Sequence, residues 1–519
     1  MKKFFAVILA GVSFFACFSA GCNQIANDEN TIEIYAFSGG YGVEFIEEIG
    51  DKFEEVYPEY SVELKSDSLL GKADAMLKAG PNNTTTDLFF TNDSVFEWVA
   101  SGDRVLKGYD VVLEDLTDIY ESESDVEGFT VGEKMYSGFE KEFLYEEYVD
   151  GEEISEYYSM PWSYGLTGLI YNETKFFAAG ITEAPRTTEE LFEDADILIK
   201  NGQVPFVTSV ETGYDVYLFN TWWAQYQTAE GCQRFWEGVN DYGEPSVEIF
   251  AQKGRLYALQ ACEQMLSPEF GRSHELINSL NYSSAQAQLY SGNACMIVCG
   301  DWYENEMYNA LGGFSDDTLK MMRTPVISQI REKTPSITSD EILREVVSYI
   351  DGDRESLPAG VTEPDAETIR VARNTVYSLG VNLSAFIPVY ATAKEGAKLL
   401  LKFMTTDEAL RLYMETTNGN TLPYRYSMSE AEQAALSDFQ ESKHEIVTDE
   451  LIYITNKNKY PLCYFGGLTE FSGDRSNIDV LLAIKEDSRR LTGEEMYLRE
   501  ISAHTESSFR NMLVRAGLA

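Results

Sequence analysis

The sequence is poor in positive charge and in histidine, and both shortages restrict what the protein can bind or catalyse. It holds 40 lysines and arginines against 86 aspartates and glutamates, which gives a formal net charge of −46 at pH 7. A surface so negative repels polyanions, and this argues against a nucleic-acid partner. The three histidines, His274, His444 and His504, lie far apart in polar surroundings. They offer neither a zinc site nor a catalytic triad.

Catalytic and cofactor motifs are also missing. The sequence contains no G-x-S-x-G, no H-E-x-x-H and no D-x-[DN]-x-[DN]-G calcium loop. The glycine-rich stretch SGGYG at 38–42 is too short to cradle a phosphate. Carboxylate pairs occur anywhere in so acidic a chain, so pairing alone is no evidence for glycosidase chemistry. We therefore expect a binding protein without a cofactor, and not an enzyme.

Cysteine is scarce, and its placement argues against a disulfide framework. Beyond Cys17 and Cys22, the remaining cysteines are Cys232, Cys262, Cys295, Cys299 and Cys463. Cys295 and Cys299 lie in the apolar run ACMIVC, which predicts a buried strand. Four residues along a strand span roughly 13 Å, too far for a disulfide, so we expect both to be core residues. A Cys232–Cys262 bridge stays open, as does the state of Cys463.

Only one apolar run is long, and it lies at the N-terminus. Lys2 and Lys3 precede the stretch FFAVILAGVSFFACFSA, and small residues then lead to Cys22. This pattern predicts a signal peptide over 1–21, a lipidated Cys22 and a tether over 22–30 that anchors the chain to the outer face of the cell membrane. Ordinary cleavage without lipid is the alternative. No second run reaches the about 20 apolar residues of a spanning helix, so we expect the rest to be extracytoplasmic and soluble.

Strands and helices alternate at the start of the mature chain. The patterns predict strands over 31–37, 60–66 and 86–92, and helices over 71–80, 94–102 and from 43 to the stop at Pro58. In the first helix, Phe45, Ile49, Phe53 and Val56 recur at helical spacing. Alternation of this kind predicts parallel βαβ units and an α/β fold. Ligands of such sheets bind beyond the carboxyl ends of strands, so the loops 38–42 and 91–94 are the ones to watch.

The rest of the chain continues this mixed pattern. Residues 109–157 are acidic and weakly periodic. We expect them to form a surface subdomain or loop that packs on the N-terminal lobe of the protein, the part that begins with the strands and helices just described. Further strands are predicted over 166–172, 204–208 and 293–300, and helices over 188–200, 215–226, 283–292, 339–350, 364–376 and 394–417. Length alone favours two domains.

Four segments carry a resemblance to a known family. They are the N-terminal strand–turn–helix, MPWSYGLTGLIYNETKFFAAGITEAPRTTEEL at 160–191, AQLYSGNACMIVCGDW at 287–302, and AKEGAKLLLKFMTTDEALRLYMETTNGNTLPYR at 393–425. In these segments the chain resembles the extracellular solute-binding proteins of carbohydrate ABC transporters, the family that includes maltose-binding protein. The segments occur in the family's order and span most of residues 31–425.

The resemblance implies a periplasmic-binding-protein-like fold of two α/β lobes with crossover hinge strands and a ligand cleft between them. The expected N-terminal lobe is 31–162 plus 378–425, and the C-terminal lobe is 163–377 plus 426–519. The implied function is capture of a sugar or oligosaccharide and its delivery to separate ABC permease and ATPase subunits, by a monomer. The alternatives are a surface glycan-degrading enzyme and a binding protein for a peptide or polyamine.

The resemblance also suggests ligand-binding residues. Matching family positions makes Tyr214 and Trp302 the first stacking candidates, followed by Trp222 and Trp223, of which only one can readily face the cleft. The further candidates are Trp162 and Tyr164 at the crossover, Asn92, Asp93 and Asp301 as hydroxyl partners, and Ser38 and Tyr41 in the first turn. Core packing is the alternative for each tryptophan and for Tyr164 and Tyr214, and helix capping is the alternative for Asp93 and Asp301.

Overall fold

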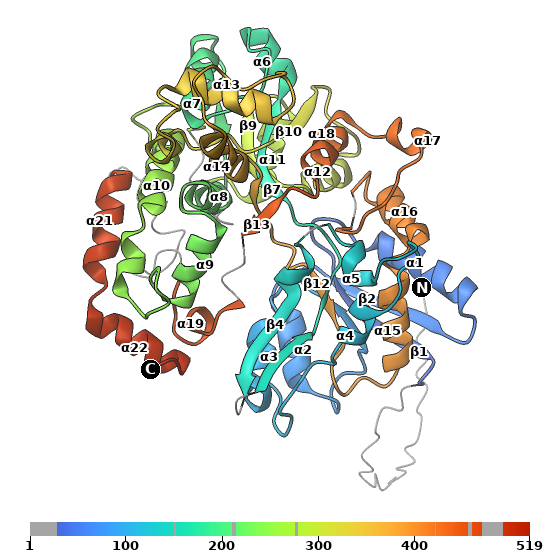
Figure 1. The fold of residues 1–519 in the computed structure, drawn as a ribbon. Helices are drawn as coiled ribbons and strands as arrows, with labels where there is room; N and C mark the ends of the chain where they lie inside the picture. The colour runs from blue at the N-terminus through green and yellow to red at the C-terminus, as the bar shows by residue number, and fades with distance from the viewer. Residues whose placement is uncertain are drawn as a thin grey trace, which may run out of the picture.

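The computed structural model describes residues 28–136, 138–149, 152–209, 214–275, 279–420, 422–454, 459–469 and 491–519. These residues form two α/β lobes (Figure 1), as the resemblance implied. The predicted signal peptide and Cys22 lie outside the described residues.

The first lobe is built on a five-stranded sheet in the order β2-β1-β3-β12-β6. The bounds are β1 (Thr31–Phe37), β2 (Ser61–Asp67), β3 (Leu88–Phe90), β6 (Met160–Pro161) and β12 (Ser384–Phe386). β1 pairs in parallel with both β2 and β3, which confirms the predicted βαβ units. β12 is antiparallel to β3 and to β6, so two strands from later in the chain complete this sheet.

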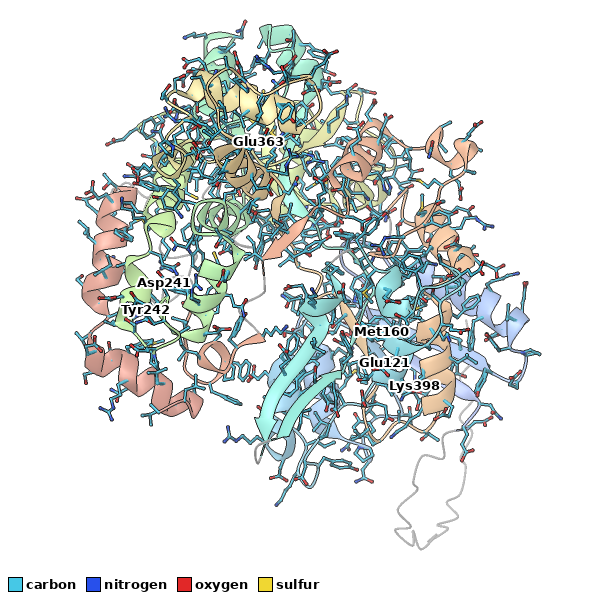
Figure 2. The ribbon with its side chains drawn as sticks, in the orientation of Figure 1. Glu121, Met160, Asp241, Tyr242, Glu363 and Lys398 are labelled. Carbon is cyan, nitrogen blue, oxygen red and sulfur yellow. The ribbon has the colours of Figure 1, made fainter. Side chains whose placement is uncertain are left out.

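Helices cover the first sheet. They are α1 (Glu44–Val56), α2 (Lys72–Ala79), α3 (Phe96–Ser101), α15 (Lys394–Phe403) and α16 (Asp407–Thr416). α1 buries Phe45, Ile49 and Phe53, as their spacing predicts, and packs against β2 and α16. Val56 ends the helix with 45% of its surface exposed, so it does not extend the buried row. Met160, labelled in Figure 2, is buried in this lobe.

The acidic segment 109–157 packs on the first lobe and contains ordered elements. They are α4 (Thr117–Glu121), α5 (Val131–Lys134), β4 (Leu144–Val149) and β5 (Glu152–Tyr157), the last two paired as an antiparallel hairpin. Glu114 binds Lys394 at 2.7 Å, and Asp118 binds Lys398 at 3.2 Å. These ion pairs attach the segment to α15.

The second lobe is built on a four-stranded sheet in the order β10-β7-β9-β8. The strands are β7 (Thr167–Asn172), β8 (Phe206–Val207), β9 (Met296–Gly300) and β10 (Leu319–Met322). All six residues of β7 are buried, because helices cover both faces of the sheet. The helices of this lobe include α6 (Glu173–Ala179), α7 (Thr188–Lys200), α8 (Asp215–Gln227), α9 (Ala229–Glu237), α10 (Lys253–Leu266), α11 (Tyr282–Tyr290), α12 (Tyr303–Leu311), α13 (Asp340–Ile350), α14 (Glu363–Arg373) and α18 (Asp438–Ile446).

One prediction in the second lobe is wrong, and one question that the sequence left open is answered. The helix predicted over 364–376 ends at Arg373, because Thr375–Tyr377 forms β11, which pairs in parallel with β13 (Ile452–Ile454). The Cys232–Cys262 bridge is not formed, since Cys232 is a buried free thiol. Cys295 and Cys299 are buried core residues, as expected.

The two lobes are joined by chain segments that run side by side. After β6 in the first sheet, the chain enters β7 in the second, and it returns between β11 and β12. Leu379 N–H donates to the Gly165 carbonyl at 2.8 Å, and Trp162 N–H donates to the Leu383 carbonyl at 3.0 Å. The outward and return segments are therefore paired, and the chain crosses once more between α16 of the first lobe and α18 of the second.

The C-terminal region adds helices to the second lobe. α21 (Gly493–Ala503) and α22 (Glu506–Ala516) lie along its outer side, whereas α19 (Pro461–Tyr464) lies on the side that faces the first lobe (Figure 1). α21 packs on α10, and α22 packs on α19. Beyond α19, the Arg104 guanidinium of the first lobe lies 5.3 Å from the Phe465 ring centroid. This end of the chain thus reaches across to the first lobe.

Candidate ligand-binding site

The turn after β1 contacts the second lobe directly. Tyr41 is 2% exposed, and its hydroxyl donates to the Asp301 carboxylate, which follows β9 of the other lobe. The Gly40 carbonyl accepts a hydrogen bond from Asn305 Nδ2 at 3.1 Å. Gly40 has φ +73°, a conformation that glycine adopts freely and that directs this carbonyl toward α12. The loop after β1, expected to face a ligand, therefore lies at the lobe interface.

Asp301 belongs to a buried polar group at this interface. Its Oδ2 accepts the Leu166 backbone N–H at 3.3 Å. Burial raises the pKa of Asp301, while Lys443 and the Tyr41 hydroxyl act in the opposite direction. Burial lowers the pKa of Lys443 to about 8, against the charges of Asp301 and Glu304. Asp301 does not cap α12, whose N-cap is Trp302 without a side-chain cap.

Trp302 and Tyr214 lie close together at the same interface. Their ring centroids are 6.2 Å apart, and the Trp302 ring lies 6.4 Å from that of Tyr41 in the first lobe. The two side chains are 7% and 8% exposed. Trp302 is thus enclosed by residues of both lobes and is not sealed inside one of them. A ligand reaches these rings only where the lobes separate.

Trp162 and Tyr164 hold the hinge. Trp162 Nε1–H donates to the Thr91 carbonyl at 2.8 Å, and its ring stacks on Phe45 with centroids 5.9 Å apart. The Tyr164 hydroxyl shares a hydrogen bond with that of Tyr453. Both side chains are at most 2% exposed. Their polar atoms are occupied by protein partners, so we assign them to the packing of the crossover.

Trp222 and Trp223 lie in the core of the second lobe, which corrects the expectation that one of them faces the cleft. They are 0% and 1% exposed. Trp222 Nε1–H donates to the Pro325 carbonyl at 3.1 Å, and Trp223 Nε1–H donates to Gln252 at 2.9 Å. Both sides of α8 are covered, because nearly all of its residues are buried.

A cavity of about 360 Å³ opens where the first lobe faces α19 of the second. Its lining residues are Gly71, Asp74, Lys78, Asp93, Ser94, Glu97, Trp98 and Tyr464. All but Tyr464 come from the first lobe, and Tyr464 comes from α19. Of these, only Asp93 is among the candidates drawn from the sequence. Trp98 follows the loop 91–94 by one helical turn, so its closeness to that loop in the sequence could have identified it as a ligand-binding candidate. No sequence pattern identifies Tyr464 as one.

Asp93 lies in this cavity as a partly buried carboxylate. It accepts a hydrogen bond from the Thr91 hydroxyl at 3.3 Å and does not cap α3, whose N-cap is Val95. Burial and the charge of Asp74 raise the pKa of Asp93. Asn92 and Ser38 are half-buried in the same two loops, but neither lines the cavity. Asp93 is therefore the predicted polar residue that lines this cavity.

The comparisons with known proteins identify the family. Residues 39–410 match the family described as bacterial extracellular solute-binding protein. The chain belongs to this family. Its members are binding proteins and not enzymes, and they act outside the cytoplasm. The chain matches no curated protein sequence.

Solved structures of solute-binding proteins share the fold. A raffinose complex of RafE is 14% identical, with TM-score 0.54, and the match covers 91% of this chain and 98% of that one. A chitin oligosaccharide binding protein is 15% identical, with TM-score 0.57, over 91% and 97%. Maltose-bound MalE3 of T. maritima is 16% identical, with TM-score 0.53, over 91% and 98%. Identities this low establish the fold only.

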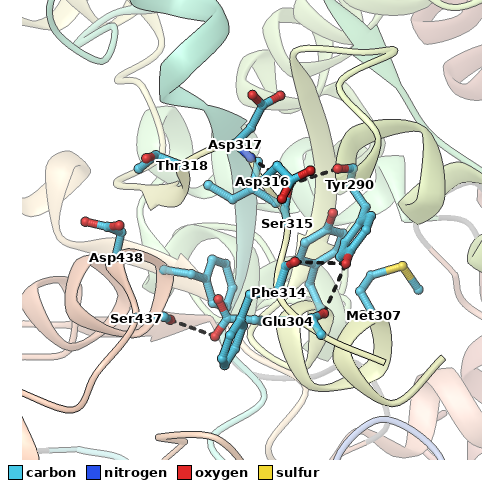
Figure 3. Close-up of a pocket in the computed structure, with 14 residues that line it drawn as sticks. Tyr290, Glu304, Met307, Phe314, Ser315, Asp316, Asp317, Thr318, Ser437 and Asp438 are labelled. Carbon is cyan, nitrogen blue, oxygen red and sulfur yellow. Dashed lines mark hydrogen bonds between the residues drawn. The ribbon is translucent and has the colours of Figure 1, made fainter. Parts of the chain in front are cut away.

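A second cavity of this solute-binding protein, of about 270 Å³, lies within the second lobe (Figure 3). It is lined by residues of α11, α12, β10 and the start of α18, all in the second lobe. Glu304 accepts hydrogen bonds there from Ser437 Oγ at 2.7 Å and from Gln440 at 2.9 Å. Its described lining includes no first-lobe residue, so lobe movement does not gate it.

Two further features concern membranes and metals. Among the described residues from 28 onward, no helix is both long and apolar enough to cross a membrane. The same part of the chain holds no cluster of three or more metal-ligating side chains.

Proposed function

We propose that this protein is the substrate-binding component of an ABC importer and that it captures a sugar or oligosaccharide between its lobes. The observation that carries the proposal is the interlobe cavity, which is lined by Trp98 and Asp93 on one lobe and by Tyr464 on the other. Family membership supplies the general role of solute binding.

The lining of the cavity suits the chemistry of a sugar. A pyranose presents flat C–H faces and a rim of hydroxyl groups. The rings of Trp98 and Tyr464 offer surfaces for the faces, and Asp93 offers an acceptor for the rim. Trp98 Nε1–H already donates to Asp74 at 2.9 Å, which fixes the orientation of its ring before a ligand arrives. A prearranged ring loses little conformational freedom on binding.

Binding is coupled to lobe closure in this proposal. A solute that touches Asp93 and Tyr464 at once binds the closed arrangement more tightly than an open one, and it shifts the population toward closure. In this proposal, the backbone bends at the paired segments around Gly165 and Leu379, which hydrogen bonds hold together. Separation of the lobes also exposes Tyr41, Trp302 and Tyr214, and an oligosaccharide long enough to reach them extends the binding surface.

The remaining parts of the proposal concern location and partners. A diacylglyceryl group on Cys22 would hold the protein at the outer face of the membrane, where monomers deliver the solute to separate permease and ATPase subunits. The solute leaves unchanged, because delivery and not hydrolysis is the role of such a protein.

Ligand screening tests this function. The purified protein is heated with neutral mono- and oligosaccharides, polyamines and peptides, and a solute that binds only the folded state raises the melting temperature. We expect a saccharide to produce this shift and to be recovered intact by chromatography. Recovery of hydrolysed sugar, or a shift by peptides alone, would contradict the proposal.

A matched pair of variants locates the site. Tyr464→Ala removes a cavity ring and is expected to weaken sugar binding by about tenfold. Tyr242→Ala removes a tyrosine that is 88% exposed on the second lobe (Figure 2) and is expected to change nothing. Equal affinities for both variants, measured by calorimetry, would place the ligand elsewhere.

A further inference from the structure

The interlobe cavity carries an excess of negative charge. Asp74, Asp93 and Glu97 line it, and Lys78 is the only lysine or arginine among its described lining residues. Lys78 is already committed, because its Nζ lies 2.8 Å from Asp74. Asp74 is further satisfied by the Trp98 indole. Among its described residues, this lining thus contains two carboxylates without a cation and no amide side chain.

Asp93 is the carboxylate that lacks a charge partner. No ion pair involves it within the described ranges, and the Thr91 hydroxyl is the only side-chain donor that reaches its carboxylate there. Beside it, the buried Ser94 Oγ has no hydrogen-bond partner in the described part of the chain. Two neighbouring residues of the cavity lining therefore have unused binding capacity: the Asp93 carboxylate has no ion-pair partner, and the Ser94 hydroxyl has no hydrogen-bond partner, among the described residues.

A neutral solute would leave this charge uncompensated. Closing the lobes over Asp93 removes water from a carboxylate, and this is unfavourable unless a positive group replaces the water. Hydroxyl groups donate hydrogen bonds to Asp93 but leave the charges of Asp93 and Glu97 unbalanced. A protonated amine balances one of them and is also favourable beside the face of an aromatic ring such as Trp98.

We infer that the solute is an amino sugar whose ammonium group pairs with Asp93, with its ring between Trp98 and Tyr464. This inference rests on the proposed function and adds the substrate class. The sugar ring uses the aromatic surfaces, its hydroxyls reach Glu97, and the amine supplies the cation that the cavity lacks.

Matched ligands test the inference. Calorimetry compares glucosamine, galactosamine and their β-1,4-linked oligomers with two counterparts of each, one N-acetylated and one with a hydroxyl in place of the nitrogen. Each set differs only in charge and substituent at one carbon. We expect the free amine to bind at least about tenfold more tightly than either counterpart.

Asp93→Asn keeps the shape and removes the charge. We expect it to weaken amine binding by about tenfold or more while leaving neutral counterparts unchanged or improved. Asp241→Asn, at an exposed position of the second lobe (Figure 2), is the control and is expected to change no affinity. The melting temperature of each variant without ligand shows that it is folded.

The outcomes separate this inference from the proposed function. If neutral sugars bind as tightly as amines and Asp93→Asn weakens all of them alike, the amino-sugar inference is overturned and sugar capture stands. If spermidine binds and no sugar does, both are overturned. If no amino sugar of the panel binds, the inference is overturned as well.

Discussion

Single side chains couple the two lobes. The Tyr41 hydroxyl and the Asp301 carboxylate meet although 260 residues separate them. Because Asp301 is buried, each donor that it accepts offsets part of its desolvation. Removal of one donor leaves the charge less compensated and favours the arrangement in which water reaches it.

Tyr41→Phe tests this coupling. We expect it to lower stability by about 1–3 kcal/mol and to separate the lobes, because a buried carboxylate loses a donor. Denaturant unfolding measures the loss of stability. The radius of gyration from small-angle scattering measures the separation of the lobes. Tyr424→Phe is the control, since the buried Tyr424 hydroxyl has no hydrogen-bond partner among the described residues. Equal behaviour of the two variants would rule out the coupling.

Asp194 in α7 makes stability depend on pH. Burial, assisted by the charge of Glu190 and opposed by that of Arg344, raises the pKa of Asp194 from 3.8 to about 7. The folded protein therefore binds the proton more tightly than the unfolded chain. Stability from this group is present at low pH and is lost as pH rises from about 4 to about 7.

Asp194→Asn should raise the melting temperature at pH 8, because the amide stays neutral where the buried carboxylate ionises. The gain should shrink toward pH 4, where the carboxyl group of the folded protein is protonated. Calorimetric melting at several pH values checks this, with the exposed Asp241→Asn as control. A gain that is the same at all pH values would show that charge is not the cause.

At the scale of elements, the hinge depends on close backbone contact. Gly165 has φ +62°, and a Cβ at this position would lie 2.7 Å from the Gly380 nitrogen. Two backbone segments meet there without room for a side chain. In the proposed lobe closure, this close approach keeps the outward and return segments paired.

Gly165→Ala is expected to be more harmful than an ordinary glycine replacement. Gly202 has φ +74°, but a Cβ added there would meet no atom within 4 Å. Gly202→Ala therefore measures only the cost in stability of holding alanine at a positive φ, about 1 kcal/mol. We expect Gly165→Ala to lower stability by about twice that or more, because a steric clash adds to the same cost. Denaturant unfolding compares the two, and equal losses would show that the hinge tolerates a side chain.

For the whole molecule, charge is the dominant global property. A net charge of −46 repels itself across the folded surface. Folding brings these charges closer together, and salt screens their repulsion.

The melting temperature should therefore rise as NaCl increases from about 10 mM to about 300 mM, a range over which the screening length falls severalfold. KCl should act equally, because the effect is one of ionic strength. A fall in melting temperature with salt would mean that favourable ion pairs outweigh the repulsion. A difference between the two salts would point to binding of a specific cation.

Local patterns anticipated much of the fold. Alternation of strands and helices predicted β1, β2 and β3 correctly, because side-chain periodicity reports which faces are buried. Periodicity failed at Thr375–Tyr377, where pairing with β13, a strand more than 70 residues later in the chain, overrides helical propensity. The candidate site was anticipated less well. Asp93 lines the interlobe cavity, whereas Trp222 and Trp223 lie in the core of the second lobe. The sequence pattern of a tryptophan is the same whether its ring packs in a core or lines a binding site, so the two cases could not be distinguished.

The sequence by itself determined the fold class, the family and the absence of catalytic motifs, since these depend on local periodicity and on segments in a fixed order. Only the tertiary structure decided which side chains meet in the cleft. Trp98 and Tyr464 lie more than 360 residues apart in the chain, and their shared cavity depends on how α19 is carried by the second lobe toward the first. Such contacts have no local signature, because they follow from the packing of entire lobes.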